Sequence, residues 1–224
     1  MYKYLLFDLD GTLTDSSEGI TKSVQASLRA IDIEEPDLSK LFVFIGPPLR
    51  ESYKKYYHMN PEQVAACLKI YRERYDAVGK FENRAYPGIV ELLQDLKQAG
   101  FCCVMCTAKP EFYAIPIAEK YNLAPQLQGV YGATLDGKMD NKALVVANAL
   151  KGMGINSEAE KAQAVLIGDR KEDVLAAHAN GIACIGVGWG FAAPGELESV
   201  NVDEQIATIE ELRQRFLTDS PQIS

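Results

Sequence analysis

Basic residues are scarce in this 224-residue sequence, which has 23 lysines and arginines against 31 aspartates and glutamates. The formal net charge of -8 leaves no electrostatic footprint for nucleic acid and would repel an anionic membrane surface. No apolar run approaches the roughly 20 residues that span a bilayer, and the few apolar residues before Asp8 are too short for a signal peptide. We therefore expect a soluble, cytoplasmic protein without nucleic-acid or membrane partners, in which a small anionic substrate needs a local positive site.

Histidine is also scarce, with two residues, and the five cysteines are an odd number. Cys102, Cys103 and Cys106 lie in one apolar run, where strand alternation points them to both faces of a sheet. Zinc binding is the alternative interpretation, but neither histidine is near these cysteines in the sequence. We predict reduced cysteines buried in a strand.

Short apolar runs that end at polar or glycine-rich residues predict buried parallel strands at 4–9, 101–106, 164–167 and 182–187. Helical patterns lie between them, at 89–99, 142–150 and 172–179. Strand and helix therefore alternate as in a doubly wound α/β fold, with a mostly parallel sheet and a Rossmann-like core. The helix after Thr107 is expected to start late or to kink, because Pro116 would otherwise lie deep inside it.

An insertion interrupts this alternation, because no strand comparable to the first begins before residue 101. Spaced apolar positions predict helices at 17–31, 49–57 and 61–78, and Asn60 is a suitable N-cap for the last of them. We predict a helical cap domain at residues 16–83, inserted into a catalytic core made of residues 1–15 and 84–218. Residues 219–224 are expected to form a disordered tail.

Acidic residues follow two of the predicted strands. Asp8 and Asp10 are two residues apart, so in an extended segment their side chains point the same way. Asp169 and Asp173 follow the third run, and ligands of open α/β sheets bind at the carboxyl ends of strands. Carboxylates this close need a cation between them, and magnesium prefers such oxygen ligands.

Each of these acids also has a purely structural interpretation. Asp10 and Gly11 alone would indicate a turn, and Asp169 and Asp173 alone would be equally consistent with the cap and first turn of a helix. Their placement at one sheet edge favours the metal site.

Two lysines and a threonine are candidates for binding an anion near these acids. Lys142 stands at the start of a helical pattern, where a lysine is unfavourable against the helix dipole, and it is therefore a candidate phosphate ligand. Thr107 offers a hydroxyl at a strand end, although such threonines often only cap the next turn. We assign Lys109 to the solvated surface.

Residues 7–15, read FDLDGTLTD, resemble the first motif of the haloacid dehalogenase superfamily phosphatases. Thr107 resembles the second motif, Lys142 the third, and residues 168–173 the fourth, in the order of the family. The insertion after the first strand lies where the helical-cap class of the family has its cap. Within the family, the sequence is most similar to the phosphoglycolate phosphatase and 5'-nucleotidase-like branch, including the cap stretch 44–50, read FIGPPLR.

The resemblance implies a magnesium-dependent phosphatase that hydrolyses a small phosphate ester through a phosphorylated aspartate. Asp8 would be the nucleophile, and Asp10 would protonate the leaving oxygen and then activate water. Asp8, Asp169 and the backbone carbonyl of Asp10 would hold the magnesium ion.

The resemblance also implies which residues would bind the phosphoryl group. Thr107, Lys142 and the backbone at Gly11 and Ala108 would bind the phosphoryl oxygens, and Asp173 would orient Lys142 and a metal-bound water.

Two rival functions compete with this one. A phosphosugar mutase fits less well, because that branch has a histidine early in the cap where Ile20 stands. A phosphate-binding module without turnover usually lacks a motif residue, and none is lacking here. The substrate is left open between phosphoglycolate, a nucleoside monophosphate and another small ester.

Arg50 is a candidate contact for the leaving group. It follows the stiff turn at residues 46–48, and a guanidinium can hold a carboxylate or phosphate by paired hydrogen bonds. The alternative is a solvated helix residue near Glu51.

Overall fold

The computed structural model describes residues 2–136 and 138–218. These residues form two compact units, one made of the described residues up to Leu13 and from Ala85 onward, the other of Thr14–Arg84. The predicted disordered tail, 219–224, lies outside the described residues. Within the described ranges, no helix is both long and apolar enough to cross a membrane.

The larger unit contains a six-stranded sheet in which every pairing is parallel, in the order β5-β4-β1-β6-β7-β8. Its strands are β1 (Tyr4–Phe7), β4 (Cys102–Pro110), β5 (Val130–Ala133), β6 (Ala164–Gly168), β7 (Ala183–Val187) and β8 (Glu204–Ile206). The predicted α/β fold with a doubly wound parallel sheet is therefore confirmed. The short strands β5 and β8 were not predicted.

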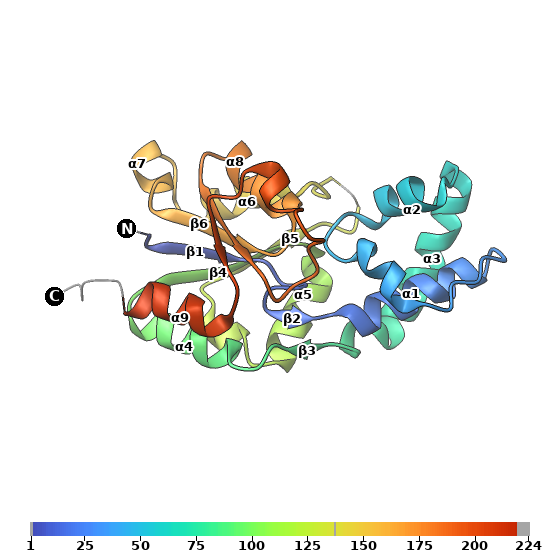
Figure 1. Ribbon diagram of the computed structural model, residues 1–224, viewed down its shortest axis with the longest axis horizontal. Coiled ribbons are helices and arrows are strands. Elements are labelled where there is room, and N and C mark those ends of the chain that lie inside the picture. The colour runs from blue at the N-terminus through green and yellow to red at the C-terminus, as the bar shows by residue number, and fades with distance from the viewer. Residues whose placement is uncertain (1, 137, 219–224) are drawn as a thin grey trace. The chain divides into compact units, whose positions relative to one another are not determined.

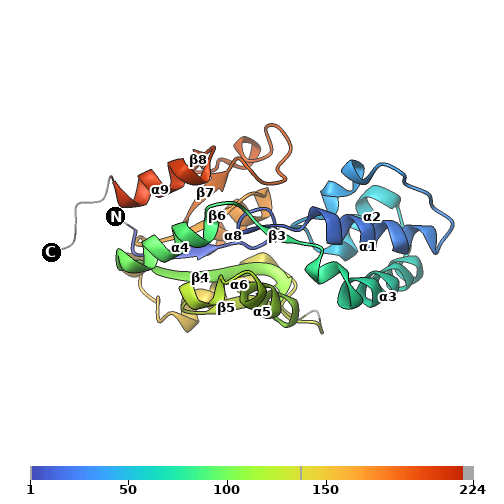
Figure 2. The ribbon, with the colours of Figure 1, turned by 90° about the horizontal axis from the view of Figure 1, so that it is seen from below.

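Helices cover both faces of this sheet (Figure 1). They are α4 (Ile89–Gln98), α5 (Glu111–Lys120), α6 (Lys142–Gly152), α7 (Glu158–Lys161), α8 (Lys171–Ala179) and α9 (Ile209–Leu217). Alternate residues of each strand face opposite layers: Val165 and Ile167 pack with α4, α5 and α9, whereas Leu166 packs with α6 and α8. Helices α4 and α9 lie side by side (Figure 2).

Helix α5 corrects one prediction. It begins at Glu111, directly after β4, and contains Pro116 at its sixth position, so the expected late start is wrong. Proline removes one helical hydrogen bond, but Ile117 and Ala118 next to it are fully buried, and this packing offsets the loss.

All five cysteines carry free thiols. Cys103 and Cys106 are buried in β4 as predicted, whereas Cys102 is only partly buried. Burial raises the pKa of the Cys103 and Cys106 thiols to about 12, so both stay protonated at neutral pH.

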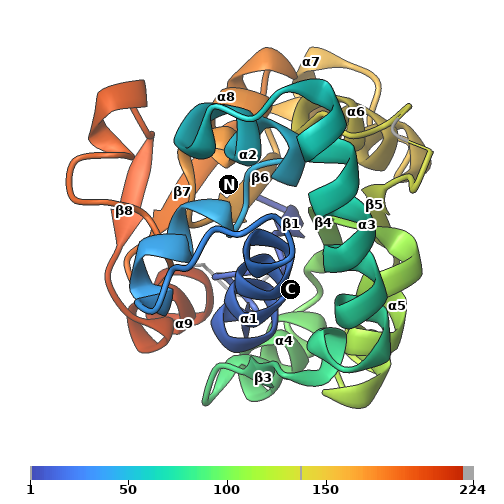
Figure 3. The same ribbon diagram turned by 90° about the vertical axis from the view of Figure 1, so that its right-hand side faces the viewer.

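The smaller unit consists of α1 (Ser17–Arg29), α2 (Leu49–Tyr57) and α3 (Pro61–Ala77), with the 3₁₀ segments η1 (Leu38–Phe44) and η2 (Gly79–Phe81). Helices α1 and α3 pack against each other (Figure 3). The N-cap of α3 is Asn60, as predicted, and it forms a capping box with Gln63. The chain enters this unit at β2 (Thr14–Asp15) and leaves it at β3 (Arg84–Ala85), and these two strands pair.

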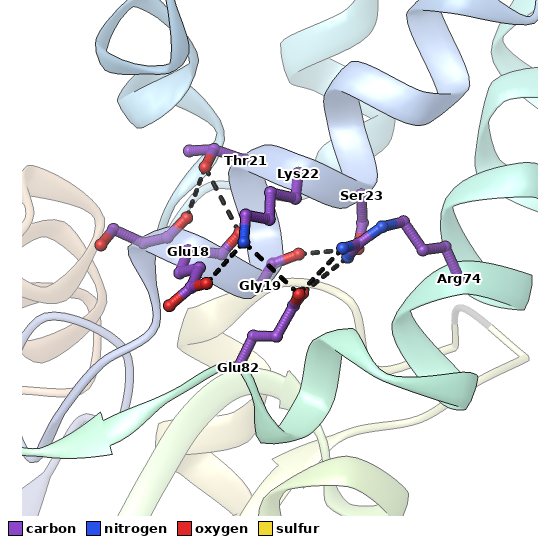
Figure 4. Close-up of polar contacts among 8 residues, drawn as sticks. Glu18, Gly19, Thr21, Lys22, Ser23, Arg74 and Glu82 are labelled. Atoms are coloured by element: carbon purple, nitrogen blue, oxygen red, sulfur yellow. Dashed lines mark hydrogen bonds and ion pairs between the residues drawn. The ribbon is translucent and has the colours of Figure 1, made fainter.

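A polar network joins α1 and α3 to the end of this unit (Figure 4). Arg74 donates from both terminal nitrogens to the Glu82 carboxylate, at 2.7 and 3.0 Å, and also to Ser23 Oγ at 3.0 Å. The Glu82 backbone oxygen accepts from the Gly19 amide at 2.9 Å. Gly19 also lies so close to Gly79 that a Cβ on it would be 2.0 Å from the Gly79 oxygen. Glycine is therefore required where the two segments meet.

Candidate active site

The candidate site lies at the carboxyl ends of three adjacent strands. Phe7 in β1 is in register with Met105 in β4 and with Ile167 in β6. The residues that follow these positions therefore come to one edge of the sheet. Asp8 follows β1 and Asp169 follows β6, as the sequence predicted from the strand ends.

Lys142 joins two of the acids. Its Nζ lies 2.6 Å from Asp8 Oδ1 and 2.8 Å from Asp173 Oδ1, and all three residues are buried. Lys142 is the first residue of α6, whose start is capped by the Asn141 side chain. Burial alone would lower the pKa of Lys142, but the Asp173 and Asp8 carboxylates outweigh it and raise that pKa above its usual range. Lys142 is therefore a fixed positive charge beside Asp8.

Asp169 is fully buried and held on both oxygens. Oδ1 accepts from the Thr12 hydroxyl at 3.3 Å, and Oδ2 accepts from the Phe191 amide at 2.7 Å. Two glycines make room for this carboxylate: a Cβ on Gly11 would lie 2.2 Å from its Oδ2, and one on Gly190 would lie 2.3 Å from its Cβ. Gly11 has a φ of 85°, which also favours glycine.

Asp8, Asp169 and Asp173 each present a carboxylate oxygen within 4.8 Å of the others. Burial raises the pKa of Asp169 well above its usual range, and the charges of Asp173 and Asp8 raise it further. Burial also raises the pKa of Asp173 to about 6, against the opposing effect of Lys142. A hard divalent cation would offset this concentration of negative charge, and an all-oxygen donor set suits magnesium. The residues present therefore fit a magnesium ion.

Asp173 serves a helix as well as the site. Its Oδ2 accepts from the Arg170 amide at 3.1 Å at the start of α8, while its Oδ1 lies 2.8 Å from Lys142 Nζ. Asp173 therefore both accepts a hydrogen bond at the start of α8 and pairs with Lys142. Asp169 does not cap α8, because the N-cap of this helix is Arg170.

Lys109 corrects another prediction, because it is not at the solvated surface. Its Nζ lies 2.8 Å from Asp10 Oδ2, and its side chain is only 6% exposed. The other oxygen of Asp10, Oδ1, is buried and has no hydrogen-bond partner among the described residues. This oxygen is therefore a candidate contact for a ligand or a water molecule.

Thr107 and Ala108 lie in β4 beside Lys109. The Thr107 hydroxyl is buried and accepts from the Lys109 amide at 3.2 Å, so it makes the local capping contact that the sequence allowed. Ala108 is half-buried. Arg50 belongs to the other unit, where it is an exposed residue in the first turn of α2.

The sequence did not single out the loop after β7. There the Trp189 indole donates to the Thr12 backbone oxygen at 3.1 Å, and the Phe191 amide donates to Asp169. The end of β7 lies at the same sheet edge as the ends of β1 and β6, so the strand-end rule could have identified this loop. Its contact with Asp169 comes from a backbone amide, which leaves no side-chain pattern.

Residues 5–187 match the family described as haloacid dehalogenase-like hydrolase, and the chain belongs to that family. It is 40% identical over 213 residues to a 5'-nucleotidase of Pseudomonas aeruginosa, covering 95% of each protein. It is 34% identical over 213 residues to the tyrosine-protein kinase PtkA of Mycobacterium tuberculosis, covering 94% of this chain and 71% of that protein.

Among solved structures, the fold is similar to the crystal structure of a predicted phosphatase from Clostridium acetobutylicum. The TM-score is 0.92 with 41% sequence identity, and the match covers 97% of this chain and 99% of that one. The predicted family resemblance is confirmed, and the chain is a phosphatase.

Proposed function

We propose that this phosphatase is a magnesium-dependent phosphomonoester hydrolase that acts through an aspartyl-phosphate at Asp8. The observation that carries the proposal is the position of the Asp8 carboxylate, which is buried at the end of β1 with Lys142 Nζ 2.6 Å from its Oδ1. A carboxylate fixed beside a buried ammonium can attack phosphorus while the ammonium stabilises the phosphoryl oxygens.

The reaction has two displacements. In the first, an Asp8 oxygen forms a bond to phosphorus, the ester P–O bond breaks, and Asp10 gives a proton to the leaving oxygen. In the second, Asp10 takes a proton from water, the water oxygen bonds to phosphorus, and the Asp8–phosphorus bond breaks to release inorganic phosphate. Asp10 serves both steps because it returns to its starting protonation state.

Other residues at the sheet edge would hold the phosphoryl group and the metal. Lys142, the Thr107 hydroxyl and the backbone at Gly11 and Ala108 would bind phosphoryl oxygens. Magnesium, when bound, supplies positive charge that offsets the repulsion between the acids and the phosphate.

The ligands for that ion would be Asp8, Asp169 and the Asp10 backbone carbonyl, with Asp173 orienting Lys142 and a bound water. One carboxylate oxygen of Asp173 lies within 4.8 Å of carboxylate oxygens of Asp8 and Asp169, so Asp173 is next to the proposed metal ligands.

The proposed substrate is a small phosphorylated metabolite, either a nucleoside monophosphate or a phosphoglycolate-like ester. The similarity to a 5'-nucleotidase supports the first. We expect a panel containing a nucleoside 5'-monophosphate, phosphoglycolate and a hexose phosphate to yield free phosphate from at least one member, in a magnesium-dependent assay. Comparison of kcat/KM across the panel identifies the preferred class.

The same panel separates the rival activities. Isomerisation of the hexose phosphate without free phosphate would establish a mutase instead. Because one relative is a tyrosine kinase, ATP and a tyrosine peptide belong in the panel too. Transfer of phosphate to the peptide without hydrolysis of any monoester would contradict the proposed function.

Arg50→Ala tests the proposed contact between the smaller unit and the leaving group. Arg50 is exposed, so its loss should leave the fold intact. If Arg50 binds the leaving group, we expect KM for the preferred ester to rise about 10-fold, the loss of one charge-assisted hydrogen bond, while hydrolysis of a small aryl phosphate is unchanged.

Arg72→Ala is the matched control, because Arg72 is an exposed arginine of α3 in the same unit. It should leave KM unchanged for both esters. Equal losses on both esters in Arg50→Ala would indicate a folding or closure defect, and no loss on either would return Arg50 to the solvated surface.

A further inference from the structure

Asp8 and Asp10 of the first motif each pair with a different lysine. Lys142 Nζ contacts Asp8 Oδ1 at 2.6 Å, and Lys109 Nζ contacts Asp10 Oδ2 at 2.8 Å. The side chains of Lys109 and Asp10 are 6% and 9% exposed, so this second pair is buried as well. The proposed function uses Lys142 to hold the phosphoryl group but leaves Lys109 without a role.

We propose that Lys109 is a positioning residue that holds the Asp10 carboxylate for proton transfer. This inference rests on the proposed function, in which Asp10 is the acid and base. Lys109 holds Oδ2, whereas Oδ1 is buried and lacks a hydrogen-bond partner among the described residues. One oxygen is thus anchored, and the other is available to the leaving oxygen and then to water.

The local sequence explains how Lys109 reaches this position. The register between β4 and β5 passes from Thr107–Gly132 directly to Pro110–Ala133, so it skips Ala108 and Lys109. An irregularity of this kind redirects side chains at a strand end. The Lys109 amide donates to the Thr107 hydroxyl at 3.2 Å and closes the bulged segment.

Gly132 permits the close approach of β5 to the bulged segment. A Cβ on Gly132 would lie 2.6 Å from the Lys109 backbone oxygen and 2.8 Å from the Glu111 amide nitrogen. Neither neighbour is a flexible side-chain end, so a larger residue would displace the backbone that carries Lys109. The bulge and the glycine together set the position of the amine.

Lys109→Met tests the inference, since methionine fills similar space without charge. Kinetics are compared for a nucleoside 5'-monophosphate, which has a poor alkyl leaving group, and for 4-nitrophenyl phosphate, which has a good one. We expect kcat/KM, which reports the first displacement, to fall about 100-fold on the first ester and less than about 5-fold on the second, because only a poor leaving group needs a well-placed acid. Lys109→Arg should recover part of the loss, and Lys151→Met, at an exposed lysine of α6, should show none.

A double-mutant cycle with Asp10→Asn shows whether Lys109 acts through Asp10. In the Asp10→Asn background, we expect Lys109→Met to change kcat/KM by less than about twofold, because the group that it positions is already inactive. If the double variant instead shows the product of the two single-variant losses, Lys109 acts independently of Asp10, and the inference is overturned. Equal losses of Lys109→Met on both esters, or no loss on either, would overturn it too.

The cycle also separates this inference from the proposed function. If Asp10→Asn is slow on the alkyl ester and Lys109→Met is not, the inference fails and the proposed function stands. If Asp10→Asn keeps the wild-type rate, the proposed role of Asp10 fails and the inference falls with it. The double variant removes both charges of the buried pair, so it keeps the test available if Lys109→Met alone leaves Asp10 unpaired and does not fold.

Discussion

Asp8→Asn is expected to abolish phosphate release, with a fall in kcat on the order of 10⁴-fold or more, because the amide cannot form the aspartyl-phosphate. The loss should be similar for alkyl and aryl esters, in contrast to Asp10→Asn. The substitution preserves shape, and Lys142 keeps its 2.8 Å contact with Asp173, so no buried charge is left alone. Rapid quenching with a labelled ester should trap label on the wild type, releasable by hydroxylamine, and none on the variant.

Asp140→Asn is the matched control, because Asp140 is an exposed acid of the same unit and the substitution changes charge equally. It should retain the wild-type rate and the wild-type label. If Asp8→Asn kept normal turnover, or carried label like the wild type, covalent catalysis through Asp8 would be wrong.

The sequence allows the prediction of those site residues that stand directly at the end of a strand or at the start of a helix. Asp8, Asp169 and Lys142 each follow a strong apolar pattern or begin a helix, and the parallel register brings Asp8 and Asp169 to one edge. Lys109 could not be placed in this way. Its position depends on a bulge in β4 and on the approach of Gly132, and neither is visible in the periodicity of the residues.

The same contrast holds for the fold. Helices α2 and α3 were predicted nearly to the residue, and for α3 the reason is that Asn60 and Pro61 mark a helix start chemically. The short strands β5 and β8 were missed because each has four residues or fewer and only partial burial. Such strands form because a longer neighbour supplies the hydrogen bonds, and this is tertiary information.

Removal of magnesium is expected to reduce turnover by roughly three orders of magnitude or more, because the buried acids at the sheet edge then repel one another and the substrate phosphate. Excess chelator should give this loss, and added magnesium should reverse it. Calcium should inhibit, since its larger and looser coordination sphere would misplace Asp8 for in-line attack. Full activity in excess chelator would contradict a metal-dependent mechanism.

A binding measurement separates metal affinity from catalysis. Magnesium should raise the melting temperature of the wild type, because a ligand that binds only the folded state stabilises it. Asp169→Asn should lose this rise, and it is a conservative probe. Its amide oxygen can still accept from the Phe191 amide, and its nitrogen can donate to the Thr12 hydroxyl, which now donates to Asp169. The variant thus removes one negative charge while the hydrogen bonds around it remain. An undiminished rise in Asp169→Asn would place the bound magnesium away from this carboxylate and would overturn the proposed ligand set.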